Sequence, residues 1–198
     1  MISEFYTITA PTEAFLHKEK KSKFWGFAMP LQNEQELKEF ITALKIKYPQ
    51  ANHFCYAWQI GISPSQHRFS DDGEPNNTAG APIYGQIQSN ELSNVAVVVL
   101  RIFGGVKLGT GGLITAYRAA AHGAIKAAAI CKMSVQKEYL LKFPYAQLHH
   151  VMRLIKKNEL LVKGQKIANQ CEVSLKVDLI KEADFLNAVA ALRDCEIL

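Results

Sequence analysis

The sequence predicts an α+β protein of two domains, residues 1–133 and residues 134–198. Three observations indicate this class. The chain of 198 residues is 48% apolar and 21% charged, a composition typical of a protein with a folded core. Strand and helix patterns alternate through the first domain. The second domain follows the order strand, helix, strand, strand, helix, strand, the split βαβ arrangement of ferredoxin-like domains.

Extended segments open the chain. Residues 4–9 predict a strand, and residues 14–31 predict a hairpin around the charged tip HKEKKSK at 17–23. We interpret the lysines of this tip as a solvated turn, because charged side chains favour the surface.

Residues 33–48 predict an amphipathic helix. Asn33 and Glu36 have the spacing of a capping box, apolar residues recur at helical intervals, and Pro49 blocks further extension. This helix is predicted to pack on the core and to carry no site.

The alternation of Phe54, Tyr56 and Trp58 within residues 53–61 predicts a half-buried strand. Such an aromatic stripe either packs in the core or stacks on nucleic-acid bases, and core packing is the commoner explanation.

The segment RFSDDGEPNNTAGAP, residues 68–82, predicts a loop throughout because it is rich in Asp, Asn, Gly and Pro. A short helix is predicted at 81–88. Residues 94–103, NVAVVVLRIF, are apolar enough for a central strand covered on both faces. A second long helix is predicted from near Thr110 to about Cys131.

The elements predicted for the second domain are a strand (134–143), a helix (145–157), two strands (159–167 and 170–178), a helix (182–192) and a short strand (195–198).

The formal net charge is +5 and is evenly spread. It favours a mild affinity for anionic partners such as RNA, without the basic stripe of a dedicated DNA binder. The four cysteines are widely spaced, which indicates a reduced chain without a zinc site. No signal-peptide pattern opens the chain, and no apolar run reaches the roughly 20 residues that span a bilayer. We therefore expect a cytoplasmic protein without a membrane segment, metal or cofactor.

Five glycines stand within nine residues where the predicted central strand feeds the second long helix. Such a turn exposes unpaired N–H groups where the helix dipole favours an anion. The candidate phosphate or partner site therefore comprises Arg101, Gly104, Gly105, Lys107, Gly109, Thr110 as a helix cap, Gly111, Gly112, Arg118 and His122.

An alternative explanation of the same glycines is open. The loop matches neither the Walker A motif nor G-x-G-x-x-G, and the glycines can serve tight turns and a close contact between helix and strand. Thr115, Arg118 and His122 recur on one helical face, which is equally compatible with a solvated stripe.

Asp71, Asp72 and Glu74 form an acidic loop with two interpretations. The carboxylates could hold magnesium beside a phosphate. Alternatively, they order the turns of their own loop and pair with Arg101, a charge that needs a partner at the end of an apolar strand.

Five cations of the second domain are candidates for contact with RNA: Arg153, Lys156, Lys157, Lys163 and Lys166. His149, Arg153 and Lys157 recur on one helical face. A basic helix on a small α/β domain is compatible with contact to an RNA backbone, and a solvated face is the alternative.

No nucleophile with a convincing base is visible, so we predict that the protein is not an enzyme. His53, His67, His149 and His150 are scattered, and no serine stands in G-x-S-x-G.

Two segments are identified as a family signature: DDGEPNNTAGAP, residues 71–82, and NVAVVVLRIFGGVKLGTGGLITAYRAA, residues 94–120. They resemble the IMPACT family, whose bacterial branch is the YigZ-like proteins. The resemblance covers about residues 1–132, and the remainder is similar to the second domain of bacterial members. Three departures bear on the family's site. Asn76 and Asn77 stand where Ser-Gly is usual, Ile102 stands where an aromatic residue is usual, and Thr115 stands where arginine is common.

The resemblance implies an N-terminal α/β domain of the kind shared by a small-subunit ribosomal protein, a domain of elongation factor G and the GHMP kinases. It implies a C-terminal domain similar to the last domain of elongation factor G. Eukaryotic IMPACT proteins regulate translation through a stress-kinase pathway, using an additional domain that we do not expect in this chain.

Two functions from different classes follow. The first is a non-enzymatic, translation-associated regulator that binds RNA, the ribosome or a protein partner through the glycine-rich loop and the basic C-terminal domain. The second is a phosphate- or nucleotide-handling enzyme that uses the glycine-rich loop and a magnesium-binding acidic loop. We favour the first, because the lysine-serine pair and the base of a phosphoryl-transfer site are missing.

Overall fold

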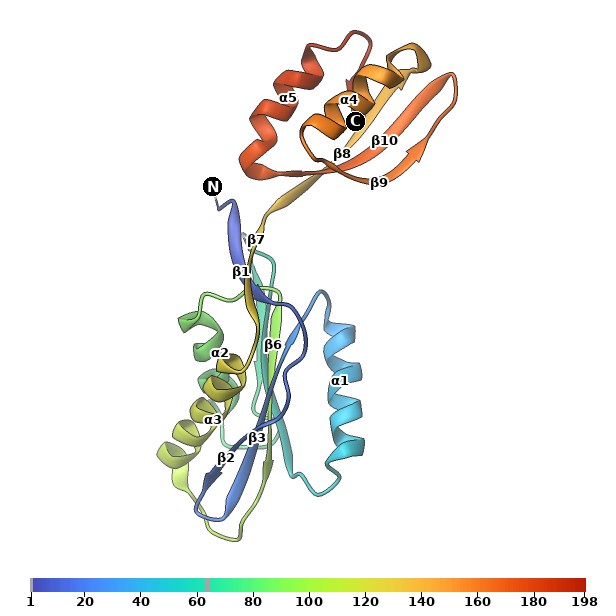
Figure 1. Ribbon diagram of the computed structural model, residues 1–198. Coiled ribbons are helices and arrows are strands. Elements are labelled where there is room, and N and C mark those ends of the chain that lie inside the picture. The colour runs from blue at the N-terminus through green and yellow to red at the C-terminus, as the bar shows by residue number, and fades with distance from the viewer. Residues whose placement is uncertain (1, 63–64) are drawn as a thin grey trace. The chain divides into compact units, whose positions relative to one another are not determined.

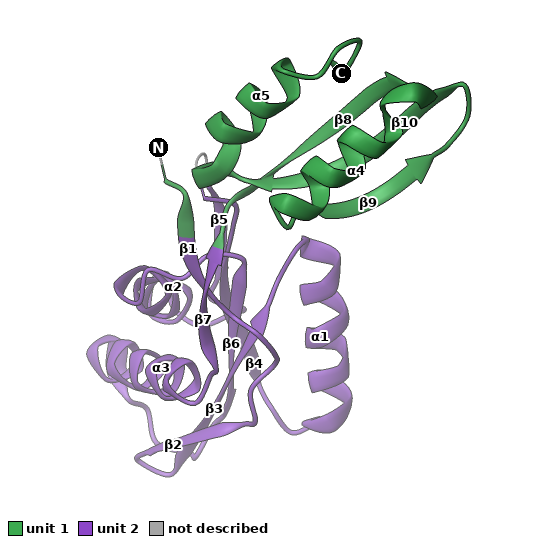
Figure 2. Ribbon diagram, turned by 45° about the horizontal axis from the view of Figure 1, so that its top comes forward, with its two compact units in different colours: residues 1–4, 134–198 green, residues 5–133 purple. Residues whose placement is uncertain are grey.

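The computed structural model describes residues 2–62 and 65–198. Strands and helices are both present in each of two compact units, so the predicted α+β class is confirmed. One unit spans Phe5–Met133, and the other combines Ser134–Leu198 with the start of the chain up to Glu4 (Figure 2). The start of the chain was predicted to belong with the first unit.

The first unit is built on a five-stranded sheet in which neighbouring strands are antiparallel. Helix α1 covers one face, and α2 and α3 cover the other (Figure 1). The strands in spatial order are β2 (Phe15–Glu19), β3 (Ser22–Pro30), β6 (Val95–Ile102), β4 (His53–Ile60) and β5 (Gln66–Ser70).

Strand β6 lies in the middle of this sheet, and the prediction of a strand covered on both faces is confirmed. Val97 and Val99 pack in the cluster beneath α2 and α3, whereas Val98 and Leu100 pack in the cluster beneath α1. All four side chains are fully buried. The continuous apolar run therefore reflects two separate cores, one on each side of the sheet.

Helix α1 (Glu34–Lys47) begins as predicted. The side-chain oxygen of Asn33 accepts hydrogen bonds from the backbone N–H groups of Gln35, at 3.1 Å, and Glu36, at 3.2 Å. In return, the Glu36 carboxylate accepts a hydrogen bond from the backbone N–H of Gln32. The two bonds to Asn33 satisfy donors that the first turn of a helix leaves free, and the bond to Glu36 holds the chain just before the cap.

Helix α3 (Gly109–Lys126) is shorter than the predicted helix, which extended to about Cys131. Cys131 instead lies in β7 (Ile130–Ser134), which pairs with β1 (Glu4–Ile8) in a separate two-stranded sheet. The alanine-rich sequence favours a helix locally, but tertiary pairing with the start of the chain overrides that preference.

The predicted loop at 68–82 is wrong at its beginning. Arg68, Phe69 and Ser70 belong to β5 and pair in register with β4. A polar edge strand lacks an apolar alternation, and for this reason its pattern resembled a loop. The helix predicted at 81–88 is α2 (Gly80–Ser89), which also includes the last three residues of the predicted loop.

The second unit has a four-stranded sheet in the order β11-β8-β10-β9. Apolar residues of α4 and α5 pack with one face of this sheet in a single core. The predicted order of strands and helices is confirmed, and its elements are β8 (Gln136–Pro144), the short 3-10 helix Tyr145–Gln147, α4 (Leu148–Lys157), β9 (Leu161–Lys166), β10 (Gln170–Asp178), the 3-10 helix Leu179–Lys181, α5 (Glu182–Ala190) and β11 (Glu196–Ile197).

Candidate functional site

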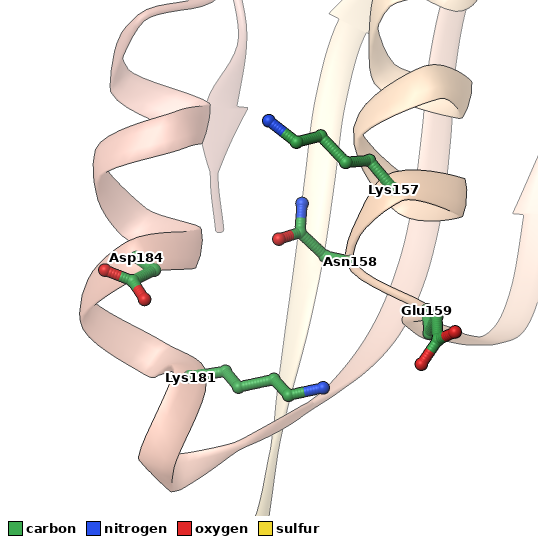
Figure 3. Close-up of a pocket in the computed structure, with 5 residues that line it drawn as sticks. All are labelled: Lys157, Asn158, Glu159, Lys181 and Asp184. Carbon is green, nitrogen blue, oxygen red and sulfur yellow. The ribbon is translucent and has the colours of Figure 1, made fainter.

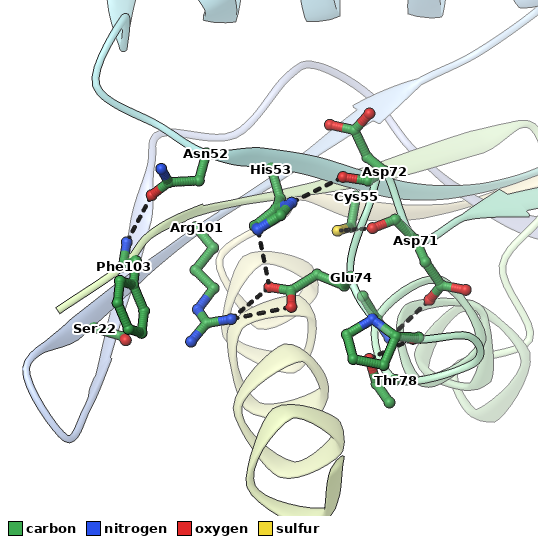
Figure 4. A network of polar contacts seen from close by, with 12 residues as sticks. Ser22, Asn52, His53, Cys55, Asp71, Asp72, Glu74, Thr78, Arg101 and Phe103 are labelled. Atoms are coloured by element: carbon green, nitrogen blue, oxygen red, sulfur yellow. Dashed lines mark hydrogen bonds and ion pairs between the residues drawn. The ribbon is translucent and has the colours of Figure 1, made fainter. Parts of the chain in front are cut away.

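A buried ion pair ties the acidic loop to the central strand of the first unit. Arg101 Nη1 donates to Glu74 Oε1 at 2.7 Å and to Oε2 at 3.0 Å (Figure 4). The two side chains are only 7% and 4% exposed. The predicted pairing of Arg101 with the acidic loop is confirmed, and the charge of Arg101 is largely neutralised inside the protein.

Two further side chains converge on Glu74. The Tyr117 hydroxyl, from α3, donates to Glu74 Oε1 at 2.8 Å, and burial raises the pKa of Tyr117, which keeps the hydroxyl a donor. His53 Nε2 lies 3.9 Å from the same oxygen. The other ring nitrogen, Nδ1, is 2.8 Å from the carbonyl oxygen of Asp72. Because a carbonyl only accepts, Nδ1 carries a proton.

Cys55 borders this cluster but is not an activated nucleophile. Its thiol donates to the carbonyl oxygen of Asp71 at 3.0 Å and lies 3.4 Å from the Tyr117 hydroxyl. Burial raises the pKa of the Cys55 thiol. The reactive thiolate is therefore disfavoured, because a buried apolar setting penalises the charged form.

Asp71 acts as a distant cap for α2. Its Oδ1 accepts hydrogen bonds from the backbone N–H groups of Ala79, at 2.9 Å, and Gly80, at 2.8 Å. Its Oδ2 accepts one from Asn77 at 2.8 Å. The residue at the N-cap position, Ala79, has no capping side chain of its own. Asp71 thus supplies what the local sequence of α2 lacks.

We expect Asp71→Asn to lower the free energy of unfolding by about 1–2 kcal/mol, because the amide retains only one acceptor oxygen for three donors. Urea denaturation monitored by circular dichroism measures this loss. Asp184→Asn is the matched control: Asp184 is exposed in the first turn of α5, and its replacement is expected to change stability little. Equal effects of the two substitutions would contradict the capping role.

The acidic loop is not arranged as a magnesium site. Asp72 Oδ2 accepts a hydrogen bond from the backbone N–H of Phe54 at 2.6 Å, so Asp71, Asp72 and Glu74 each have a different set of partners. Within residues 2–62 and 65–198, no group of three or more His, Cys, Asp or Glu residues is placed to hold a metal ion. The alternative prediction, a loop that orders its own turns and pairs with Arg101, is confirmed.

The glycines after β6 have different structural reasons. A Cβ atom on Gly104 would collide with the carbonyl group of Lys21 at the tip of the β2–β3 hairpin. Gly105 and Gly109 have φ angles of +83° and +71°, which residues other than glycine rarely adopt. The predicted role in tight turns is confirmed for Gly105 and Gly109. The close contact at Gly104 is with the hairpin tip and not, as predicted, between helix and strand. Gly111 has no atom within 4 Å of its ideal Cβ position, so neither role explains it.

The start of α3 differs from the prediction. Leu108 occupies the N-cap position without a capping side chain, and Thr110 lies exposed in the first turn. The predicted capping by Thr110 is therefore wrong. Lys107 is exposed beside this helix start, and the binding of an anion to this helix start remains a prediction.

The structure does not unite all candidates of the glycine-loop site. Arg101 is buried in its ion pair, whereas Arg118 and His122 are exposed on α3. Arg118 lines a groove of about 460 Å³ together with Asn77 and Gly85. Arg101 and Arg118 therefore occupy different environments and do not form one phosphate-binding site.

The basic candidates of the second unit divide between two faces. Arg153, Lys156 and Lys157 are exposed on α4. Lys166 stands opposite Glu172 in the sheet, while the neighbours of Glu172 along β10 point into the core beneath the helices. Lys166 therefore lies on the face that the helices leave uncovered.

Lys163 and Lys157 have different surroundings. Lys163 Nζ forms an ion pair with Glu138 Oε1 at 2.6 Å. Lys157 lines a small pocket of about 240 Å³ together with Lys181 and Asp184 (Figure 3). The five cations predicted as RNA contacts are thus not one surface.

Three members of the buried cluster were not predicted from the sequence: Cys55, Tyr117, and His53 as a neighbour of Glu74. Tyr117 is a single polar group in an apolar helix face, a pattern equally typical of core packing. His53 stands directly opposite Arg101 in the sheet. This pairing would have identified His53 as a neighbour of the site. Predicting it, however, requires the register of two strands that are far apart in the sequence.

These features define a class: a two-unit α+β protein whose first unit joins an acidic loop, a central strand and a glycine-rich loop. The Impact N-terminal domain family matches residues 20–125. The chain belongs to the IMPACT family, as its signature segments predicted.

Relatives of known name agree with this assignment. IMPACT family member YigZ of Escherichia coli is 32% identical over 154 residues, covering 77% of this chain and 76% of the relative. The protein IMPACT homolog of Saccharomyces cerevisiae is 33% identical over 96 residues, covering 46% of this chain and 36% of the relative. A crystal structure described as a hypothetical protein has a TM-score of 0.77 and 27% identity, covering 100% of this chain and 98% of its own.

Proposed function

We propose that this protein is a non-enzymatic, translation-associated regulator that binds RNA or the ribosome. Membership of the IMPACT family supports the connection with translation, because the eukaryotic members regulate it. In this proposal the second unit resembles the last domain of elongation factor G. The protein acts in the cytoplasm and binds RNA, the ribosome or a protein partner there.

The exposed basic face of α4 carries the proposal. Arg153, Lys156 and Lys157 project from it, while Val151, Leu154 and Ile155 anchor the helix in the core. No carboxylate within 4.0 Å pairs with these three cations in the part of the chain that the structure describes. Unpaired cations on one helix face are suited to contact with phosphates, and such contacts release counterions from RNA.

The enzymatic alternative relied on the carboxylates of the acidic loop, and these carboxylates already have hydrogen-bond partners within the protein. Asp71, Asp72 and Glu74 are occupied by backbone donors, a buried arginine and a tyrosine. A nucleotide-dependent rise in melting temperature with magnesium present would revive this alternative.

We expect the full chain to bind a labelled single-stranded RNA with an affinity that falls as salt rises. Arg153→Gln/Lys156→Gln should weaken binding about tenfold and reduce the slope of log Kd against log salt by about 1.4. Fluorescence anisotropy over a salt series measures both quantities. Lys38→Gln/Lys126→Gln removes the same charge from exposed positions on α1 and α3 and is expected to have a much smaller effect.

Sedimentation of the tagged protein from a lysate through a sucrose gradient tests the connection with the ribosome. Salt-sensitive co-migration with ribosomal subunits, abolished by RNase, is the expected result. Protein that stays at the top of the gradient at low salt would contradict a ribosomal role.

A further inference from the structure

The tip of the β2–β3 hairpin and the glycine-rich loop meet at one end of the first unit (Figure 1). The backbone N–H of Gly104 donates to Ser22 Oγ at 3.2 Å, across 82 positions of sequence. A side chain at Gly104 would collide with the backbone of Lys21. The absence of a side chain at Gly104 therefore allows two distant segments to form one continuous surface.

Five lysines are exposed on these two segments: Lys18, Lys20, Lys21, Lys23 and Lys107. Within residues 2–62 and 65–198, no carboxylate lies within 4.0 Å of any of them. Glu19 is the one acidic residue in either segment. Phe103 and Val106, in the glycine-rich loop, are 46% and 41% exposed. The surface is therefore basic, uncovered and without internal neutralisation.

The hairpin keeps these lysines where the fold favours other residues. Lys20 and Lys21 have φ angles of 42° and 69°, a conformation for which Asn-Gly is the preferred pair in a two-residue hairpin turn. Lys18 and Lys23 stand directly opposite each other, an arrangement in which like charges repel. Local choices that oppose the fold are typical of functional positions.

We propose that the hairpin tip and the glycine-rich loop form one surface that binds the phosphate backbone of RNA. This inference rests on the proposed function and adds to it a contact surface in the first unit. RNA matches the surface better than a protein partner does, because positive charge is concentrated on the patch and suits a row of phosphates. The glycines after Gly104 keep the loop backbone accessible to a closely approaching phosphate.

The test compares the full chain with Lys20→Asn/Lys21→Gly. This variant removes two charges and introduces the pair that the turn conformation prefers, so the melting temperature should stay the same or rise. Anisotropy with the same labelled single-stranded RNA should show binding about tenfold weaker and a salt slope lower by about 1.4. Lys38→Gln/Lys126→Gln controls for net charge, and Arg153→Gln/Lys156→Gln reports on α4 separately.

The possible outcomes distinguish a failure of the proposed surface from a failure of the proposed function. Weaker binding of the hairpin variant than of the charge control supports the surface. Unchanged binding of the hairpin variant, with weaker binding of the α4 variant, overturns the surface and leaves the proposed function intact. Equal losses in the hairpin variant and the charge control also overturn the surface, since net charge then explains both. Failure of the wild-type chain to bind RNA overturns both proposals.

Discussion

Glu74→Gln is expected to lower the free energy of unfolding by about 3–5 kcal/mol, because it leaves the buried guanidinium of Arg101 without its counterion. Arg101 is 6% exposed, and Glu74 is its ion-pair partner among the described residues. The substitution preserves the size of the side chain, so the loss reports charge and hydrogen bonding. Urea denaturation measures it.

The contrast with an exposed pair makes this prediction specific. Glu34 and Arg68 lie 3.7 Å apart with side chains 45% and 62% exposed, and Glu34→Gln should change stability little, since solvent screens such pairs. Glu74→Leu/Arg101→Met removes both charges and is expected to recover part of the loss. A Glu74→Gln protein as stable as the Glu34→Gln protein would show that the buried pair is not a structural anchor.

Gly26→Ala is expected to lower the free energy of unfolding by about 3 kcal/mol. Gly26 lies on β3 where α3 crosses the sheet, and a Cβ atom there would collide with the carbonyl oxygen of Ala120. That oxygen belongs to helix backbone and has no rotamer by which to move aside. The helix must shift away from the strand, which disturbs a closely packed core.

A second glycine-to-alanine substitution should have the opposite sign. Gly85 lies inside α2, and its ideal Cβ position has no atom within 4 Å. Gly85→Ala should therefore raise the free energy of unfolding by up to about 1 kcal/mol, because alanine favours the helix. Thermal denaturation of both variants gives the comparison. A loss of stability in both variants would contradict the explanation that close contact between α3 and β3 causes the loss at Gly26.

The sequence predicted those elements whose pattern repeats over many residues. The capping residues and periodicity predicted α1 almost to the residue, and the apolar run predicted the central strand β6. The order of elements in the second unit was also correct, because strands β8 and β10 alternate and each helix has one apolar face. Local periodicity is a direct consequence of which side of an element faces a core.

The sequence failed where long-range pairing overrides local preference. Strand β5 is polar and is defined by its register with β4, and α3 ends early because the following residues pair with β1. Neither outcome can be read from a window of neighbouring residues, since each depends on a segment elsewhere in the chain.

The candidate site shows the same division. The sequence by itself determined the residue types of the acidic loop, the need of Arg101 for a counterion and the glycine-rich turn after the central strand. Only the tertiary structure decided that Glu74 is that counterion, that His53 and Tyr117 join it, and that the backbone of Lys21 lies against Gly104. The physical reason is that strand register and helix packing, set by the two cores as a whole, choose which distant side chains become neighbours.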